Sequence, residues 1–172
     1  MNGLPIVRIA ARLRRLGLAL VLGMAASVAP TVSAAPTVGE RIQLTATLPD
    51  GGSVSLDDAK GRRTLLVLWS PASLAWRKSM GWLERFAASP EAAAVFLLAV
   101  SVDADAASLR DFMAARGAKL PVILRGSDNL GVLEDHRLPL LLVIDAEGRL
   151  LRHHIGMFNS KTLRELLDPP PR

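Results

Sequence analysis

The sequence predicts an α/β protein of one domain, with a mixed central sheet flanked by helices. Two continuous apolar runs, Thr64–Trp69 and residues 94–102, are typical of strands that are covered on both faces. The segment between them has apolar residues at helical spacing. The last third of the chain indicates two strands joined by a tight turn and then a helix. This order of elements favours a mixed sheet with helices on both faces, and 172 residues suit a single domain.

The first part of that domain is predicted to be a β-hairpin. Alternating residues in 41–56 flank the turn sequence Pro49-Asp50-Gly51-Gly52. The segment 73–88 then reads as a helix with Ser73 at its N-cap. Its apolar side chains recur at helical spacing, with charged residues between them: Trp76, Met80, Leu83 and Phe86.

The second half continues with a helix at 108–116, which Gly117 closes. A short strand at 120–124 and one helical turn at 130–135 follow. The residues 140–144 and 150–155 flank a turn at 145–148 and predict a second hairpin. A last helix starts at Asn159-Ser160 and ends before the proline run at 169–171.

Residues 1–34 have the pattern of an export signal, so we expect the folded domain to span residues 38–168. The segment starts with four arginines and no acid, continues with an apolar stretch at 16–29, and ends with small residues at Val32 and Ala34. We expect cleavage after Ala34. An uncleaved membrane anchor is the alternative, although the stretch is short for a bilayer span. The pattern predicts an exported protein, located in the periplasm of a Gram-negative source.

The charge of the chain argues against nucleic-acid binding. The formal charge is +5, from 21 Lys and Arg against 16 Asp and Glu. Without the four arginines of the signal, 17 basic residues remain, so the domain carries a net charge of +1. A nucleic-acid-binding domain would concentrate basic charge on its folded part.

The chain contains no cysteine. Thiol peroxidase chemistry, disulfide exchange, thiolate metal sites and iron–sulfur clusters all need a cysteine sulfur. The sequence therefore excludes these functions for the chain acting alone.

An ordered set of motifs over most of the domain resembles the exported thioredoxin-like proteins of the TlpA/ResA type. Their pattern is a strand that ends in Trp, a short loop, Cys-x-x-Cys, Arg-Lys and a Met in the following helix. The matching residues here are Trp69, Ser70-Pro71-Ala72, Ser73-Leu74-Ala75-Trp76, Arg77-Lys78 and Met80. The segment "LPLLLVIDAEGR" at 138–149 is similar to the family's cis-proline segment, strand and turn. The stretches "SPASLAWRK" and "GMFNSKTLRELL" are similar to MauD, the accessory protein of methylamine dehydrogenase maturation.

The resemblance implies a thioredoxin fold with an N-terminal hairpin and a central insertion. It also places the family's two active-site cysteines at Ser73 and Trp76. Disulfide exchange requires a thiolate, so the family's oxidoreductase activity is not expected to carry over. The family's peptide-docking surface needs no sulfur, because it holds an extended peptide by strand addition beside a cis-proline. On the resemblance we expect that surface to include Trp69, Trp76, Leu138 and cis Pro139, with Trp82 as a further aromatic candidate.

Several of these residues have alternative interpretations. Trp76 is either an interface anchor or part of the core, and the core is the favoured alternative for Trp69. Ser73 is either a helix cap or, with His136 and an Asp, a nucleophile. His153 and His154 point to opposite faces of the expected strand, which argues against joint metal binding. Asp103 and Asp105 fit a helix cap better than a metal site. We expect no metal ion and no cofactor.

The leading hypothesis is a redox-inactive, polypeptide-binding accessory or maturation factor for another exported protein. Its partner is expected to be an extended polypeptide, and contact with a membrane is expected only through residues 1–34. A thiol–disulfide oxidoreductase that uses a partner's dithiol is the alternative. A structural domain without a groove is a third interpretation.

Overall fold

The computed structural model describes residues 36–168 except residues 49, 60, 104, 132 and 134, so the expected export signal lies outside the described residues. The elements follow in the order β1 (Leu44–Thr47), β2 (Ser53–Ser55), η1 (Leu56–Ala59), β3 (Thr64–Trp69), α1 (Leu74–Ala87), η2 (Pro90–Ala94), β4 (Phe96–Ser101), α2 (Ala106–Ala115), β5 (Leu124–Asp128), η3 (Asp135–Arg137), β6 (Leu140–Ile144), β7 (Leu150–Ile155) and α3 (Ser160–Leu167). None of these helices combines the length and the apolar character needed to span a bilayer.

The strands form one mixed sheet in the order β2-β1-β5-β4-β3-β6-β7. Strand β3 lies inside the sheet, parallel to β4 and antiparallel to β6. Every residue of β3 is buried, because helices cover one of its faces and other strands cover the other. This double burial explains the continuous apolar run that the sequence shows at this place.

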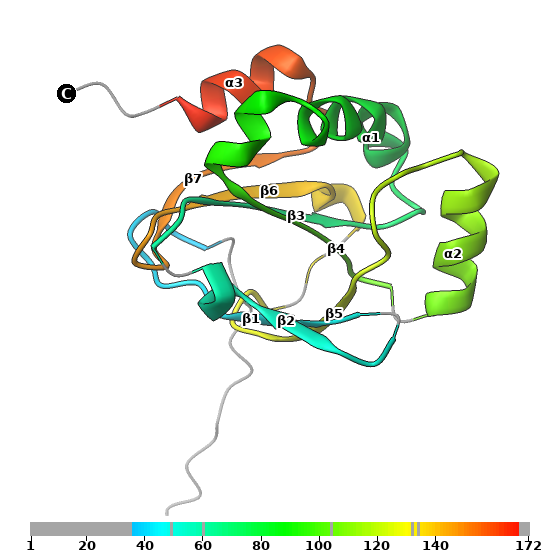
Figure 1. Ribbon diagram of the computed structural model, residues 1–172, viewed down its shortest axis with the longest axis horizontal. Coiled ribbons are helices and arrows are strands. Elements are labelled where there is room, and N and C mark those ends of the chain that lie inside the picture. The colour runs from blue at the N-terminus through cyan, green and yellow to red at the C-terminus, as the bar shows by residue number, and fades with distance from the viewer. Residues whose placement is uncertain are drawn as a thin grey trace, which may run out of the picture. The chain divides into compact units, whose positions relative to one another are not determined.

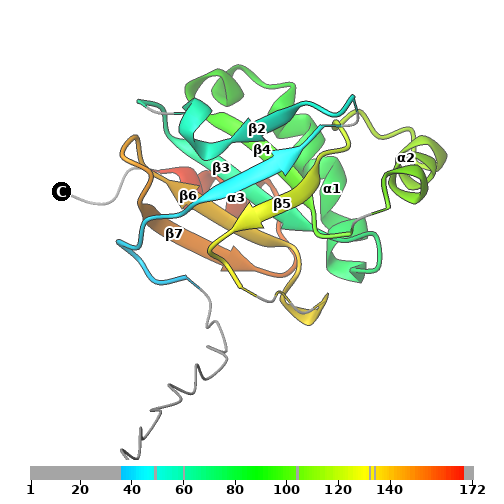
Figure 2. The ribbon, with the colours of Figure 1, turned by 90° about the horizontal axis from the view of Figure 1, so that it is seen from below.

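The two faces of the sheet are covered by different kinds of structure. Buried side chains of α1, α2 and α3 all join one hydrophobic cluster, and α1 and α3 lie side by side on this face (Figure 1). Among the described residues, the second cluster contains no side chain from these three helices. It is covered instead by residues of β1 and η1 and by irregular chain that includes Ile42, Ile123 and Leu130. Figure 2 shows β1, β2 and β5 crossing this face. The three α-helices α1, α2 and α3 therefore all pack on one face of the sheet, and the expectation of helices on both faces is wrong for them.

The predicted elements occur at or near their expected positions, with clear shifts only between residues 120 and 137. Strand β5 begins at Leu124, where the prediction placed the end of a strand. The preceding Leu120, Val122 and Ile123 are buried as irregular chain, and β5 pairs mainly with β1. The helical turn expected at 130–135 is found at Asp135–Arg137.

Gly126 allows β5 to approach β1 closely. A Cβ atom at this position would collide with the backbone oxygen of Thr45 on β1. The register between these strands shifts at the same point, between Leu44 and Ala46. A glycine inside a strand is typical of such an irregularity.

Candidate functional site

Ser73 connects the start of α1 to the loop before β6. Its hydroxyl accepts a hydrogen bond from the backbone N–H of Trp76 at 3.2 Å and so caps the helix. The same hydroxyl donates a hydrogen bond to the backbone oxygen of Leu138 at 2.7 Å. Ser73 is 6% exposed, so both bonds lie in the interior of the protein. The cap interpretation of Ser73 is confirmed.

A cis peptide bond and two further hydrogen bonds fix the chain segments next to the start of α1. The Leu138–Pro139 peptide bond is cis, as the resemblance implies. The backbone oxygen of Pro139 accepts a hydrogen bond from the N–H of Gly156 at 2.9 Å. Ser79, a fully buried residue of α1, accepts a hydrogen bond from the backbone N–H of Phe158 at 3.0 Å. Ser73, the N-cap of α1, and Ser79 within the helix therefore each bond to a segment that is more than sixty residues away in the chain.

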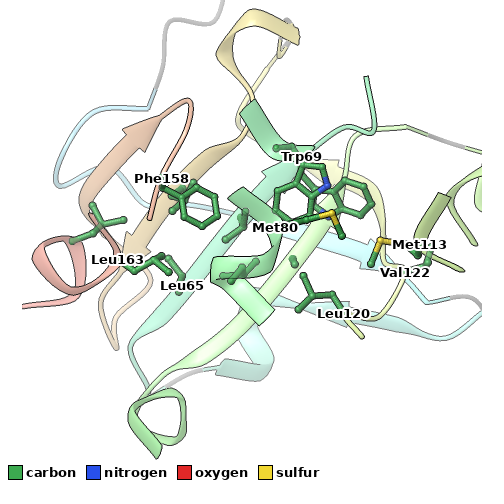
Figure 3. Close-up of a cluster of buried hydrophobic side chains, with 14 of the residues drawn as sticks. Leu65, Trp69, Met80, Met113, Leu120, Val122, Phe158 and Leu163 are labelled. Carbon is green, nitrogen blue, oxygen red and sulfur yellow. The ribbon is translucent and has the colours of Figure 1, made fainter. Parts of the chain in front are cut away.

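Trp69 and Trp76 are part of the core. Both side chains are fully buried, and their rings stack at 4.7 Å between centroids with 22° between their planes. Figure 3 shows Trp69 in the cluster with Met80, Met113 and Val122. The expectation that these two tryptophans offer an aromatic patch to a partner is wrong, because Trp76 folds inward against Trp69. Neither indole N–H has a hydrogen-bond partner within the described part of the chain.

Leu138 and Pro139 are also buried, with Leu138 packed in the second cluster. Their side chains therefore offer no surface to a partner. The Leu138 backbone oxygen already accepts the Ser73 hydroxyl, so one acceptor of the expected docking edge is used internally.

Other apolar side chains around the same loop are exposed. Leu74 follows Ser73 and is 57% exposed, Ile155 pairs with Leu140 and is 39% exposed, and Met157 is 61% exposed. We call these three residues the cis-proline surface. Of the three, only Leu74 could have been predicted from the sequence to be exposed, because it falls outside the apolar helical stripe formed by Trp76, Met80 and Leu83.

The geometry does not support the nucleophile interpretation of Ser73. A hydroxyl has a single proton, and that of Ser73 is donated to Leu138 rather than to an imidazole. His136 is exposed on η3. Ser73 is therefore a positioning residue of this surface.

The remaining polar candidates have structural contacts. His153 and His154 face opposite sides of β7, and the ring of His154 contacts the backbone oxygen of Met157 at 3.0 Å. No group of three or more His, Asp or Glu residues suited to a metal ion occurs among the described residues.

Asp105 is the N-cap of α2, as one of the two aspartates was expected to be. The hydroxyl of Ser108 and then the backbone N–H groups of Ala107 and Ser108 hold the pKa of the Asp105 carboxyl below its usual range. Hydrogen bonds to a carboxylate favour its charged form, which is the cause of this shift. Asp103 instead interacts with Ser101, whose hydroxyl accepts its backbone N–H at 3.1 Å.

Comparison with known proteins gives structural matches only. No protein-family model and no curated protein sequence matches the chain. Among solved structures, a Chlorobium tepidum protein assigned as the thiol:disulfide interchange protein DsbE is similar at a TM-score of 0.63 and 22% identity, over 76% of this chain and 95% of that chain. StoA from Bacillus subtilis is similar at a TM-score of 0.58 and 18% identity, over 77% of this chain and 100% of that chain.

A third structure, the exposed lipoprotein thioredoxin Etrx1 of Streptococcus pneumoniae, matches at a TM-score of 0.57 and 22% identity. The match covers 72% of this chain and 96% of that chain. Each match spans nearly all of the other protein, and the mixed sheet with its three helices agrees with them. The chain therefore has the thioredoxin fold.

Proposed function

We propose that this protein is a redox-inactive, thioredoxin-fold accessory factor that binds an extended polypeptide of another exported protein. The observation that carries the proposal is the arrangement around Ser73. The serine lies where the resemblance places a catalytic cysteine, and its hydroxyl fastens the proline loop to α1. The site therefore retains a positioned loop and an exposed apolar rim without a thiolate.

The cis-proline surface is the proposed contact region. Leu74, Ile155 and Met157 are among the large apolar side chains that remain exposed in the described chain. The segment that carries Met157 and follows Ile155 is held by hydrogen bonds from Gly156 to Pro139 and from Phe158 to Ser79. Exposed apolar side chains on a preorganised surface are typical of a protein-interaction site, because little entropy is lost when a partner binds.

The type of thioredoxin-like protein, its role in the cell and its export are also part of the proposal. On the resemblance of its motifs, the chain is a TlpA/ResA-type protein with similarity to MauD, which fits a role in the maturation of a periplasmic enzyme. The residue pattern at 1–34 and the names of two structural neighbours, an exposed lipoprotein and a secreted isomerase, support export of this chain.

The alternative is a thiol–disulfide oxidoreductase, which the names of the structural neighbours favour. That reaction needs an attacking thiolate and a second sulfur, and this chain supplies neither. Insulin reduction by dithiothreitol, measured as turbidity, discriminates the two functions. We expect no acceleration by the purified protein, and catalytic turnover would overturn the redox-inactive assignment.

Binding of a permanently unfolded protein tests the proposed surface. The probe is fluorescently labelled, reduced and carboxymethylated α-lactalbumin, followed by anisotropy. We expect the wild-type protein to bind it and the double variant Leu74→Ser/Met157→Ser to bind roughly tenfold more weakly, because apolar contact area is lost. Val38→Ser is the matched control, since Val38 is an equally exposed apolar side chain (66%) beyond the cis-proline surface. Equal binding by the wild type and the double variant, or no binding by either, would contradict the proposal.

A further inference from the structure

A second surface lies between α1 and α3, which run side by side on one face of the sheet (Figure 1). We call this surface the α1–α3 groove; its volume is about 760 Å³. Its apolar floor includes Phe86 of α1 with Leu163 and Leu167 of α3. Trp82 forms part of its edge and is 37% exposed. The groove belongs to the C-terminal half of α1, about 14–20 Å along the helix from Ser73, so it is separate from the cis-proline surface.

The edge of the groove carries positive charge. Arg63, Arg85 and Arg164 line it, together with the acids Glu91 and Asp168. Within the described chain none of the three guanidinium groups has an ion-pair partner. Arg63 donates to the backbone oxygen of Leu167 at 2.8 Å, and Arg85 lies over the Trp82 ring at 4.0 Å from its centroid.

One acid of the groove is already satisfied by its own surroundings. The Glu91 backbone N–H and the Ser89 hydroxyl lower the pKa of Glu91, and Arg164 adds a smaller electrostatic contribution. Glu91 is therefore ionised, and the lining carries three arginines against two acids, a net charge of +1. Arg63 and Arg85 form no ion pair with a carboxylate among the described residues, so both can bind a group outside the chain. Carboxylates suit them best, because a guanidinium can bind a carboxylate with two hydrogen bonds.

The shape of the groove favours a helix as its occupant. Its lining comes at helical spacing from both sides: Trp82 and Phe86 of α1, with Ser89 just after this helix, face Ser160, Leu163 and Leu167 of α3. An amphipathic helix lays an apolar stripe of the same spacing into such a groove. Many of the lining side chains, Trp82, Arg85 and Arg164 among them, remain exposed to solvent. The groove is therefore too open to enclose a small ligand.

The charge of the groove selects between possible sources of that helix. Residues 1–34 of this chain carry four arginines and no acid, and the chain ends in three prolines and an arginine. Both segments would place positive charge against positive charge. A second copy of the chain, docked through the same groove, would also bring its own arginines. We propose that the α1–α3 groove binds an acidic amphipathic helix of a partner protein.

Two synthetic peptides test this inference on the full-length protein. The first has 18 residues, with leucines spaced to form one apolar stripe and glutamates on the other face. The second has lysine in place of every glutamate. We expect the glutamate peptide to bind at least roughly tenfold more tightly in isothermal titration calorimetry, with an affinity that falls as salt is added. Binding of both peptides alike, or of neither, would overturn the proposal.

Charge reversal identifies the surface. The variant Arg85→Glu/Arg164→Glu should invert the preference, so that the lysine peptide binds more tightly than the glutamate peptide. The matched control is Arg77→Glu/Lys78→Glu, which makes the same change of charge on exposed positions of the same helix outside the groove. This control and Leu74→Ser/Met157→Ser should both retain the preference of the wild type, which separates the groove from the cis-proline surface. An equal loss of preference in the control would overturn the proposal.

Removal of the apolar edge gives an independent readout. Trp82→Ala should weaken binding of the glutamate peptide roughly tenfold, because partly exposed tryptophans at an interface often dominate its affinity. Sedimentation of the peptide-free protein tests whether a second copy of the chain occupies the groove. If the wild type is a dimer and the Arg85→Glu/Arg164→Glu variant is a monomer, the proposal of a partner helix is wrong.

Discussion

The hydroxyl of Ser73 donates a hydrogen bond to the backbone oxygen of Leu138 at 2.7 Å, across 65 residues of sequence. The same oxygen atom of Ser73 accepts the N–H of Trp76. One small side chain therefore joins the first turn of α1 to the residue before cis Pro139. In a protein without cysteine, this bond takes the role of a structural link at a position where the resemblance implies redox chemistry.

Loss of the Ser73 hydroxyl should destabilise the protein. Ser73→Ala removes the helix cap and leaves the buried Leu138 oxygen without its donor, so we expect a loss of about 1–3 kcal/mol in the free energy of unfolding. Urea unfolding followed by circular dichroism measures this change. Ser127→Ala is the control because Ser127 is an exposed serine on β5. A stability of Ser73→Ala equal to that of the control would contradict the structural role of the hydroxyl.

Trp76 should act as a core residue rather than as a binding residue. Trp76→Ala removes a fully buried ring and its stacking contact with Trp69, and should cost about 3–5 kcal/mol of stability. Trp76→Phe should cost much less, because it keeps an aromatic ring and the indole N–H has no partner to lose. Denaturant unfolding compares the two variants. Similar losses in both would indicate that the indole N–H makes a bond that the described contacts do not include.

Two glycines should respond to alanine in opposite directions. Gly126→Ala places a Cβ against the Thr45 backbone oxygen, so β1 and β5 must separate and the protein should lose more than about 1 kcal/mol. Gly81→Ala lies inside α1, where the added Cβ would meet only the end of the Arg85 side chain at 3.7 Å. This change should stabilise the protein by about 0.5–1 kcal/mol because alanine has the higher helix propensity. Thermal unfolding measures both variants, and a destabilised Gly81→Ala would refute the second expectation.

Acid should remove the stabilisation that Asp105 provides. Its hydrogen bonds to Ser108 and Ala107 lower the pKa of the carboxyl in the folded protein. A group with a lowered folded-state pKa stabilises the protein above its unfolded pKa and loses this effect as the pH falls through the folded pKa. The stability difference between the wild type and Asp105→Asn should therefore be largest near neutral pH and shrink below about pH 4.

Ser108→Ala tests the cause of that effect. The Ser108 hydroxyl makes the largest contribution to the shift, so this variant should show part of the change in pH dependence that Asp105→Asn shows. Urea midpoints measured between pH 7 and pH 3 give the comparison. A constant difference between wild type and Asp105→Asn over this range would rule out the proposed linkage.

The sequence was sufficient to predict most of the fold. In most segments the local pattern of apolar residues agrees with the burial that the tertiary structure imposes. The continuous apolar run at Thr64–Trp69 is a buried central strand, and the hairpin strands Leu140–Ile144 and Leu150–Ile155 have their predicted bounds. The last helix starts where it was predicted to start, and Asn159 caps it, since its side chain accepts the N–H groups of Lys161 and Thr162. The strand predicted at 120–124 was less well placed, since it lies at Leu124–Asp128. Strand β5 is short, contains Gly126 and depends on pairing with β1, which lies far away in the chain.

By itself the sequence determined that the protein has no thiol, and that its elements are those of a thioredoxin fold. Composition excludes a chemistry outright, and short-range periodicity reports which face of each element is buried. Only the tertiary structure decided that Trp69 and Trp76 stack in the core while Leu74 and Met157 remain exposed. It also brought Ser73 to Leu138 and Ser79 to Phe158. Exposure and long-range hydrogen bonds depend on what the rest of the chain places around a residue, and no local pattern encodes that.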